Sequence, residues 1–375
     1  MSVKIINDLA SFKSIQEDWD RLYELNEHLT VFSSWHWNYN WYETIGKNEG
    51  ELFLVVVSNK EGLPVGIAPL SLKKRGRKSV LSFLNDDYVA DYSDFIFDNT
   101  FADYFFNELF ATLNEHKKMW SQIELSRVRN DSLSFEQLEK YLGKSNGVSS
   151  FICHAPVLKI EEDWESFFPK LSKKLRQELR TTKNKIKKEF NCEPVFIDHD
   201  QKEDLYKSLV KFHVSRQENK VGTSFFLEEE LSSFYKRLID DLSPVSETNI
   251  SGIIIDDKVV SVVMGFKDRD HFRYWIPSFD SAIRIGSLGK LHLSYLVESS
   301  FLNEMKGFDL MIGVENYKLK WANESVDCFQ FNYFKRPMDR LLFETKNDLK
   351  EKVKPMVKQN KILNSLYRKL SKHGS

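Results

Sequence analysis

The sequence predicts an α/β protein, with α+β character, in which two tandem domains each contain a mixed, twisted sheet flanked by helices. Three observations predict this fold class. The chain has 375 residues, which is more than one ordinary compact core accommodates. Helix-like and strand-like patterns alternate along it, and one order of elements returns in the second half. We place the domains at residues 1–160 and 161–340, and we expect a basic helical tail over residues 341–375.

A β-hairpin is the first clear element of the first half. Residues 52–58 (LFLVVVS) and 65–72 (VGIAPLSL) are rich in β-branched and aliphatic side chains, and the segment 59–62 between them favours a turn. The elements predicted after the hairpin are strands at 80–84 and 94–97, a helix at 101–115 and a strand at 122–125. The first half therefore has the order β-β-β-β-α-β.

The second half shows a similar order. Its predicted elements are strands at 251–255, 259–266 and 271–276, a helix at 288–305 and a strand at 308–312. Asp256 and Asp257 supply the turn of the second hairpin. We interpret the two halves as a diverged tandem repeat.

Helices are predicted between the two sheets, at residues 161–171, 172–189, 203–217 and 227–242. The second of these is strongly basic, because KKLRQELRTTKNKIKK contains eight Lys or Arg and one Glu. Such a stretch is usually a solvated helix face. It also suits a nucleotide-sugar diphosphate, a lipid-linked diphosphate, anionic lipid or tRNA.

Composition narrows the class of protein. Lys and Arg (54) nearly balance Asp and Glu (55), so the net charge of −1 gives no general reason to expect a nucleic-acid or membrane protein. No apolar run approaches the roughly 20 residues of a membrane span, and no signal-peptide pattern opens the chain. We expect a cytoplasmic protein whose membrane contact would be peripheral, at the inner face, through the basic helix or tail. The three cysteines lack metal-binding spacing, so we expect reduced thiols and no metal.

Two glycines stand three residues apart where a strand gives way to a helix, in the segment FDSAIRIGSLGKLHL over residues 279–293. Free backbone N–H groups at such a junction, together with the helix dipole, bind a pyrophosphate. The residues assigned to this cofactor site are Arg284, Gly286, Ser287, Leu288, Gly289 and Lys290. The alternative is a plain glycine turn in which Ser287 caps the helix.

A polar cluster, DLMIGVENYKLKW, follows the next strand over residues 309–321. Ligands bind at the carboxyl ends of strands in open α/β sheets. The sequence therefore predicts that this cluster and the glycine loop belong to one site.

These two segments resemble the GNAT acyltransferases that accompany bacterial cellulose and exopolysaccharide synthesis, often called CelD-like or BcsL-like. The positions that match the motifs S-P-G-x-L and D-x-G-x-G-x-E-x-Y-K-x-x-W are Ser287, Gly289, Leu291, Asp309, Gly313, Glu315, Tyr317, Lys318 and Trp321. Leu288 replaces the usual proline, and Met311 replaces the usual first glycine. The resemblance implies tandem GNAT folds, acetyl-CoA or a longer acyl-CoA as donor, and a sugar, nucleotide-sugar or lipid-linked acceptor.

The resemblance also suggests roles for single residues. Lys318 would stabilise developing charge or contact phosphate, and Tyr317 would lie beside it. Glu315 and His213 are the candidate proton acceptors, the histidine because imidazole titrates near neutral pH. The alternatives are a solvated lysine, a packed tyrosine and a hydrogen-bonded structural histidine.

The residues assigned to the acceptor, in the cleft between the domains, are Trp35, Asp91, Asp94, Arg216 and Trp275. Trp35 is alternatively a core residue, and the aspartates are alternatively ordinary turn residues. A rival function comes from the Fem-type ligases, which share the double fold and transfer amino acids from aminoacyl-tRNA to peptidoglycan precursors. A third interpretation is a noncatalytic double-GNAT module.

Overall fold

The structure is a computed structural model that describes residues 2–85, 89–142, 146–198, 202–218, 223–240 and 246–359. The elements of the first half are β1 (Ser2–Ile6), α1 (Leu9–Ser14), α2 (Gln16–Leu25), α3 (Trp35–Trp41), α4 (Lys47–Glu49), β2 (Gly50–Ser58), β3 (Pro64–Arg75), β4 (Lys78–Phe83), β5 (Ile96–Phe97), α5 (Ala102–Glu115), β6 (Gln122–Arg129), α6 (Leu133–Leu142) and β7 (Gly147–Lys159). The elements of the second half are α7 (Trp164–Phe167), α8 (Lys173–Phe190), β8 (Val195–Asp198), α9 (Lys202–Glu218), α10 (Glu229–Asp240), β9 (Ser246–Ile255), β10 (Lys258–Asp268), β11 (His271–Phe279), α11 (Leu288–Leu302), β12 (Gly307–Asp309), β13 (Glu324–Phe334) and α12 (Pro337–Gln359).

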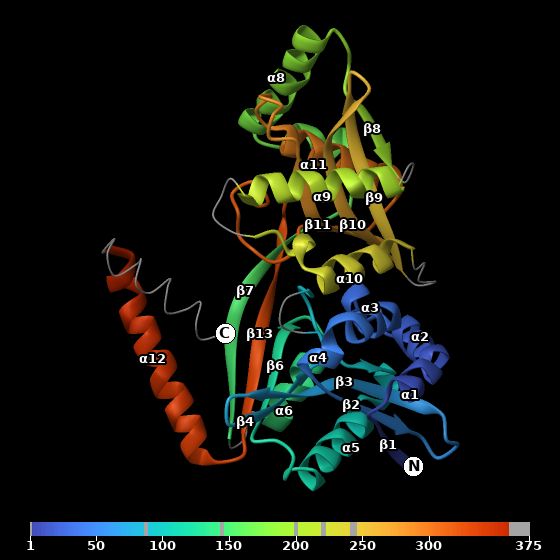
Figure 1. Cartoon of the computed structure of the whole chain (residues 1–375), viewed down its shortest axis with the longest axis vertical. Helices are drawn as coiled ribbons and strands as arrows, with labels where there is room; N and C mark the ends of the chain where they lie inside the picture. The colour runs from blue at the N-terminus through green and yellow to red at the C-terminus, as the bar shows by residue number, and fades with distance from the viewer. Residues whose placement is uncertain are drawn as a thin grey trace.

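The described strands form one continuous mixed sheet of thirteen strands. The order is β1-β2-β3-β4-β6-β13-β7-β12-β11-β10-β9-β8, and β5 pairs with β3. Figure 1 shows the second half stacked on the first along the long axis, with β7 and β13 running between them. The predicted domain limits at residues 160 and 340 stay a prediction, because the sheet passes through both halves without a break.

The last strand of each half lies in the other half. β13 closes the second half in sequence, yet it pairs with β6 of the first half through Phe334 and Gln122. β7 closes the first half in sequence, yet it pairs with β12 of the second half through Leu158 and Phe308. β7 and β13 also pair with each other along most of their length. Each half therefore completes its sheet with a strand from the other.

The predicted repeat is present. The order β2-β3-β4-α5-β6 in the first half corresponds to β9-β10-β11-α11-β12 in the second, and each set contains one parallel pair, β4 with β6 and β11 with β12. The predicted strand at 308–312 ends early, because Met311 and Gly313 have φ angles of 64° and 111°, which no strand adopts. The predicted helix at 161–171 is wrong in extent, since only α7 and a 3₁₀ turn form there.

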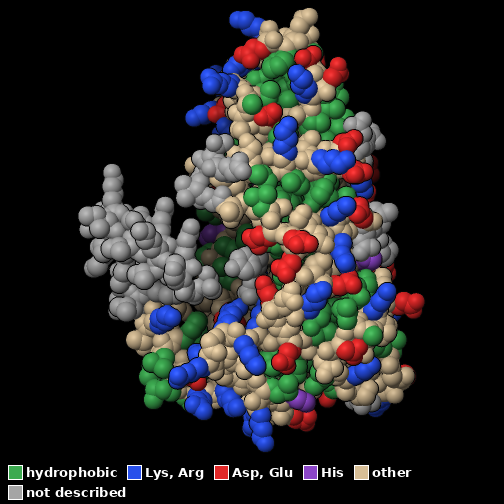
Figure 2. Space-filling view, in the orientation of Figure 1, with side chains coloured by type: hydrophobic (Ala, Val, Ile, Leu, Met, Phe, Trp, Pro, Cys, Tyr) green, Lys and Arg blue, Asp and Glu red, His purple; other side chains and the backbone are tan. Residues whose placement is uncertain are grey.

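The basic helix α8 is docked by its apolar face. The Ser172 hydroxyl accepts the Leu175 N–H at 3.2 Å and caps the helix, which ends at Asn191 in the left-handed conformation. Its buried side chains recur at helical spacing and pack toward α11: Leu175, Leu179, Thr182 and Ile186. Lys and Arg side chains consequently gather on the outer surface at this end of the molecule (Figure 2).

An aromatic core joins the two halves. The Trp37 ring lies 4.7 Å from Phe32, 5.5 Å from Phe266 and 5.2 Å from Trp275, measured between ring centroids. Trp37 and Phe32 belong to the first half, and Phe266 and Trp275 belong to the second. Deleting a buried ring of this kind costs about 3–5 kcal/mol, so this core holds the halves in a fixed relation.

A buried ion network crosses the same junction. The Arg273 guanidinium donates to Asp268 at 2.9 Å and to Asp309 at 2.8 Å. The hydroxyls of Tyr23 and Tyr92, both from the first half, donate to these two carboxylates at 2.8 and 2.9 Å. The first half therefore orients the ends of β10 and β12, from which the chain enters the predicted site.

The tail helix α12 begins at Pro337, where the sequence predicted a helical tail from residue 341, and it extends away from the sheet (Figure 1). Over the described residues, no helix combines the length and apolar character needed to span a membrane.

Candidate active site

The parallel strands β11 and β12 separate after a short pairing. They pair from His271 with Gly307 to Arg273 with Asp309. Beyond this point β11 continues to Phe279, whereas β12 has ended. An opening between the carboxyl ends of two parallel strands is where ligands bind in sheets of this class.

The N-terminus of α11 follows the carboxyl end of β11. Ser287 has a φ of 71°, and its carbonyl accepts the N–H groups of Lys290 and Leu291 at 3.0 Å. Ser287 occupies the N-cap position, as the alternative predicted, but its side chain makes no capping hydrogen bond. Within the described part of the chain, the N–H groups of Leu288 and Gly289 have no backbone acceptor. They are donors at the positive end of a helix of 15 residues.

The two glycines of the loop are not required by the protein's own packing. A Cβ atom at Gly286 would meet no heavy atom within 4 Å, and one at Gly289 would lie 3.7 Å from the Phe279 ring, which is an ordinary contact. Neither glycine has a positive φ. The open space at Gly286 belongs to a cavity of about 440 Å³ lined by Lys174, Gln177, Glu178, Thr181, Thr182, Lys185, Gly286 and Ser287. These residues fit an anionic diphosphate, which needs free N–H groups and a close backbone approach.

Helix α8 holds this loop in place. The Thr182 hydroxyl donates to the Gly286 carbonyl at 3.1 Å, and the Lys185 ammonium donates to the Arg284 carbonyl at 3.0 Å. The Arg284 side chain is exposed, whereas Leu288 is buried against the core below the loop. Of the residues predicted for the cofactor, Leu288 therefore presents only its N–H group at the loop, because its side chain is buried.

Lys290 and Lys320 are held by one carboxylate. The Glu178 side chain of α8 lies 2.8 Å from the Lys290 ammonium and 3.5 Å from the Lys320 ammonium. The hydrogen bond from Lys290, aided by the charge of Lys320, lowers the pKa of Glu178. The sequence predicted Lys290 at this site, whereas the contribution of Glu178 depends on the docking of α8.

Lys318 is buried on the β12 side of the opening. Its side chain is 7% exposed, and its ammonium donates to the Ile312 carbonyl at 2.7 Å and pairs with Glu315 at 3.1 Å. Gly313 has a φ angle of 111°, which residues with a Cβ atom rarely adopt, so glycine is favoured at this position. The turn after β12 therefore brings a buried cation and a half-exposed carboxylate together, and both residues belong to the sequence motif.

Asp91 reaches this turn from the first half. Its carboxylate accepts the Ile312 N–H at 3.3 Å. Burial raises the pKa of Asp91 to about 6, although the nearby charges of Arg127 and Lys318 act in the opposite direction. A carboxyl group with this pKa can accept a proton near neutral pH. The sequence assigned Asp91 to the acceptor; its contact with the turn after β12 depends on packing between the halves.

Arg216 lies near the far end of β11, and its charge acts on Tyr317. The Arg216 guanidinium lies 5.2 Å from the centre of the Phe279 ring and 3.5 Å from the Pro277 carbonyl. Burial raises the pKa of Tyr317 to about 12, and the charge of Glu315 adds to this effect. The phenol is therefore neutral at physiological pH and available as a proton donor.

His213 occupies a structural environment. Its Nδ1 lies 2.8 Å from the Ser224 hydroxyl, and its ring packs against Phe225 and Phe226 at centroid distances of 4.5 and 5.2 Å. Burial, together with the charge of Arg216, lowers the pKa of His213 to about 4. The imidazole is thus neutral at pH 7, and its contacts are those of the structural alternative.

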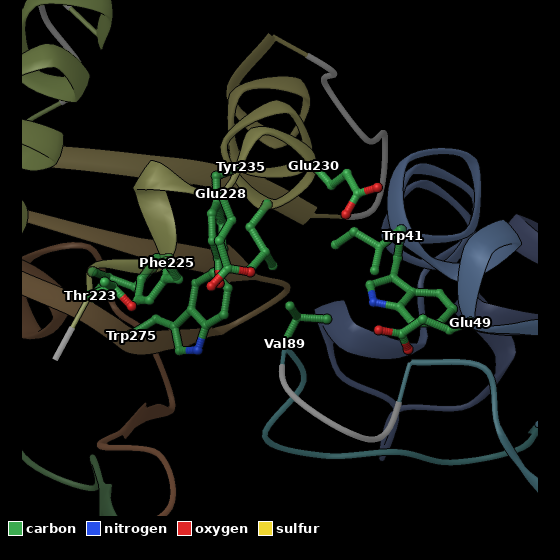
Figure 3. Close-up of a pocket in the computed structure, with 12 residues that line it drawn as sticks. Trp41, Glu49, Val89, Thr223, Phe225, Glu228, Glu230, Tyr235 and Trp275 are labelled. Carbon is green, nitrogen blue, oxygen red and sulfur yellow. The ribbon is translucent and has the colours of Figure 1, made fainter. Parts of the chain in front are cut away.

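A second cavity, of about 580 Å³, lies between the two halves. Trp41 and Glu49 line it from the first half, and Glu228, Tyr235 and Trp275 line it from the second, as Figure 3 shows. Its full lining is Trp41, Ile45, Glu49, Val89, Thr223, Phe225, Glu228, Glu230, Leu231, Tyr235, Trp275 and Ile276. Of the five residues predicted for the acceptor, Trp275 is among these described lining residues.

The Tyr235 hydroxyl is a polar group inside this cavity wall. The residue is 4% exposed, and its hydroxyl has no hydrogen-bond partner among the described residues. Burial raises the pKa of Tyr235 well above its ordinary value, and the charge of Asp91 acts in the same direction. Tyr235 therefore lies within electrostatic reach of Asp91 and, through it, of the turn that carries Lys318.

Trp35 and Asp94 lie in the interior of the first half. Trp35 stacks on Tyr39 at 4.4 Å and donates from Nε1 to the Phe12 carbonyl at 3.2 Å. Asp94 accepts the Phe95 N–H at 2.7 Å, and burial raises its pKa to about 6. These contacts are those of core residues, so the structure does not bring either side chain to the described lining of the cavity.

The second half matches a known domain. Residues 173–319 match the family described as an acetyltransferase (GNAT) domain. This segment contains the glycine loop, Glu315 and Lys318, so the chain carries a GNAT-type acetyltransferase domain. No curated protein sequence matches the chain.

Solved structures share the fold at low sequence identity. FemX has a TM-score of 0.60 at 12% identity, with 89% of this chain and 97% of that chain covered. A conserved protein of unknown function from Bacteroides thetaiotaomicron VPI-5482 has a TM-score of 0.56 at 10% identity, with 88% and 100% covered. The C-terminal domain of a putative lysylphosphatidylglycerol synthetase from Agrobacterium fabrum has a TM-score of 0.53 at 10% identity, with 89% and 96% covered. These likenesses concern the fold alone, and the expected fold class is confirmed.

Proposed function

We propose that this chain is an acyltransferase that moves an acyl group directly from acyl-CoA to a sugar or sugar-linked intermediate of surface-polysaccharide biosynthesis. The observation that carries the proposal is the opening between β11 and β12, which has free N–H groups of α11 on one side and buried Lys318 on the other. The opening lies within the segment that matches a GNAT acetyltransferase domain. The CelD-like or BcsL-like motifs support the choice of acceptor pathway.

The donor fits the opening by its diphosphate. The N–H groups of Leu288 and Gly289, the open space at Gly286 and the lysines around it would hold that group. Acyl-CoA then brings its thioester into the opening, and acetyl-CoA or a longer acyl-CoA would serve. The chain's contribution at this step is positioning.

The acceptor would occupy the cavity between the halves. Aromatic side chains line it, and so do the three carboxylates of Glu49, Glu228 and Glu230. Aromatic faces and carboxylates favour a cation, and they disfavour a diphosphate. These features support a sugar that carries an amino group, and therefore N-acylation.

The transfer requires a proton acceptor, charge stabilisation and a proton donor. The acceptor nitrogen would attack the thioester carbonyl carbon and lose a proton to Asp91, whose pKa of about 6 suits the task. Lys318 would stabilise the developing negative charge. The carbon–sulfur bond would then break, and Tyr317 would protonate the departing thiolate.

Calorimetric titration with CoA, acetyl-CoA and longer acyl-CoAs tests the proposal. We expect saturable binding and, with aminosugar acceptors, release of free CoA thiol that a thiol reagent detects. Failure of every acyl-CoA to bind would contradict the proposal.

A second candidate function is aminoacyl transfer from tRNA to a cell-wall precursor, as in Fem-type ligases. The exposed basic residues of α8 support it: Lys173, Lys174, Arg180, Lys185, Lys187 and Lys188. The fold shared with FemX is compatible with it. Retardation of aminoacyl-tRNA in a gel, without CoA binding, would favour this function, and binding of neither ligand would favour a noncatalytic module.

A further inference from the structure

Glu178 bridges the two sides of the donor opening. Lys290 lies in the first turn of α11, after β11, and Lys320 lies in the turn that follows β12. The Glu178 carboxylate contacts both, at 2.8 and 3.5 Å. Because these two strands are the pair that separates, the carboxylate spans the mouth of the opening between them.

The same carboxylate faces the space beside the glycine loop. Glu178 lines the cavity that contains Gly286, and one turn further along α8 the Thr182 hydroxyl is bonded to the Gly286 carbonyl. The positive end of α11 and two lysines make this a site for an anion. The anion that contacts these two lysines is the Glu178 side chain.

We propose that Glu178 is an internal counter-ion that holds the phosphate site of the donor opening and is exchanged for the diphosphate when acyl-CoA binds. The proposal rests on the acyl-CoA function proposed above. Lys290 and Lys320 remain paired before and after the exchange, so neither ammonium is left without a partner. Glu178 is thus a specificity-determining residue, because a ligand must bring enough negative charge to replace it.

The other acidic residue of α8, Glu189, has a different environment. Glu189 pairs with Lys185 at 3.5 Å within one helix, and both side chains are more than two-fifths exposed, at 46% and 43%. The Glu178 side chain is 25% exposed and joins two elements other than its own. Exposed ion pairs within one helix contribute little to stability, so Glu189 provides a matched control on the same helix.

The test is calorimetric titration of the full chain and its variants with CoA at low ionic strength. We expect Glu178→Gln to bind CoA roughly tenfold more tightly, because one like charge is removed from the site. The control Glu189→Gln should bind as the unaltered chain does. Lys290→Gln should bind roughly tenfold more weakly. A higher salt concentration should reduce the gain in CoA affinity of Glu178→Gln, because ions screen the repulsion between the Glu178 carboxylate and the diphosphate.

Two further probes separate this inference from the proposed function. Pantetheine lacks the diphosphate, so its affinity should be the same for the unaltered chain and Glu178→Gln. Inorganic pyrophosphate needs only the anion site, so it should bind Glu178→Gln more tightly even if CoA does not bind at all. That last result would uphold the counter-ion and contradict the acyl-CoA function.

A purely structural role for Glu178 predicts the opposite pattern. If Glu178 only fastened α8 to α11, its replacement would loosen the loop and weaken binding of both CoA and pyrophosphate. Unchanged or weaker binding of both ligands by Glu178→Gln would overturn the inference.

Discussion

Asp91 and Lys318 both form hydrogen bonds with the backbone of Ile312. The Asp91 carboxylate accepts the Ile312 N–H at 3.3 Å, and the Lys318 ammonium donates to the Ile312 carbonyl at 2.7 Å. One side chain comes from the first half and the other from the second. The turn after β12 is therefore fixed from both halves, and any ligand in the opening would meet a carboxylate and an ammonium at a set separation.

Replacing Asp91 by Asn should lower kcat and leave CoA affinity nearly unchanged. The unaltered enzyme should gain activity with rising pH around an apparent pKa near 6, and Asp91→Asn should lose this dependence. A pH–rate profile of both proteins checks the prediction. An unchanged profile would show that another group accepts the proton.

The same substitution should stabilise the fold at neutral pH. The pKa of Asp91 is raised on folding, from about 3.9 in a free chain to about 6. Between these values the folded state binds more protons, so stability falls as pH rises through this window and is lowest above it. The raised pKa of Asp91 therefore lowers the free energy of unfolding at neutral pH by at most about 3 kcal/mol. Thermal unfolding should show that the stability advantage of Asp91→Asn over the unaltered chain is larger at pH 8 than at pH 5. A larger advantage at pH 5 would refute the burial argument.

Lys318→Met should reduce turnover more than donor binding. The substitution removes the ammonium beside Glu315 and keeps the length of the side chain, so we expect kcat to fall about 100-fold and the CoA affinity to change by less than about threefold. Steady-state kinetics with calorimetry checks this. Lys320→Met, in the same turn, is the control that should affect binding more than turnover.

Gly289→Leu should weaken CoA binding at least about tenfold without loss of stability. Helix propensity favours the replacement by up to about 1 kcal/mol, and the Phe279 ring leaves an ordinary contact distance at the Cβ position. Ala282→Leu adds the same bulk at an exposed position of the same loop and should bind CoA normally. Equal affinities for the two variants would rule out the loop as the donor site.

Tyr235→Phe should raise the KM for the acceptor and leave the stability of the protein unchanged. No described hydrogen bond is lost, because the Tyr235 hydroxyl has no partner among the described residues. Tyr206→Phe is the matched control, since the Tyr206 hydroxyl donates to the Ser232 carbonyl at 3.3 Å outside the cavity. A normal KM in Tyr235→Phe would exclude its hydroxyl from the acceptor site.

The repeat and the position of the glycine loop between a strand and a helix were predictable because their signals are local. The hairpin strands alternate or run apolar over six or more residues, and the glycine loop lies between a strand and a helix in the sequence itself. β7 and β13 escaped prediction because their side chains are mostly half-buried or exposed and show no clean alternation. Their strand conformation comes from pairing with each other and with the opposite half.

The cavity between the two halves could not be predicted for a related reason. Tyr235 is one of several apolar residues of an amphipathic helix, and Glu228 precedes that helix as an ordinary acidic residue. Only the contact between the halves makes them walls of one cavity. Trp35 and His213 were assigned to a site because tryptophan and histidine often bind ligands. In the structure both side chains make packing contacts with neighbouring aromatic rings.

The exchanged strands bear on how the chain acquires its structure during synthesis. The first half cannot fill the place beside β6 until residues 324–334 have left the ribosome, so its sheet must wait with an unpaired edge while nearly all of the chain is made. Two genes each encoding one half would yield fragments that lack a strand and expose that edge. Such a topology favours inheritance of the pair as a single reading frame.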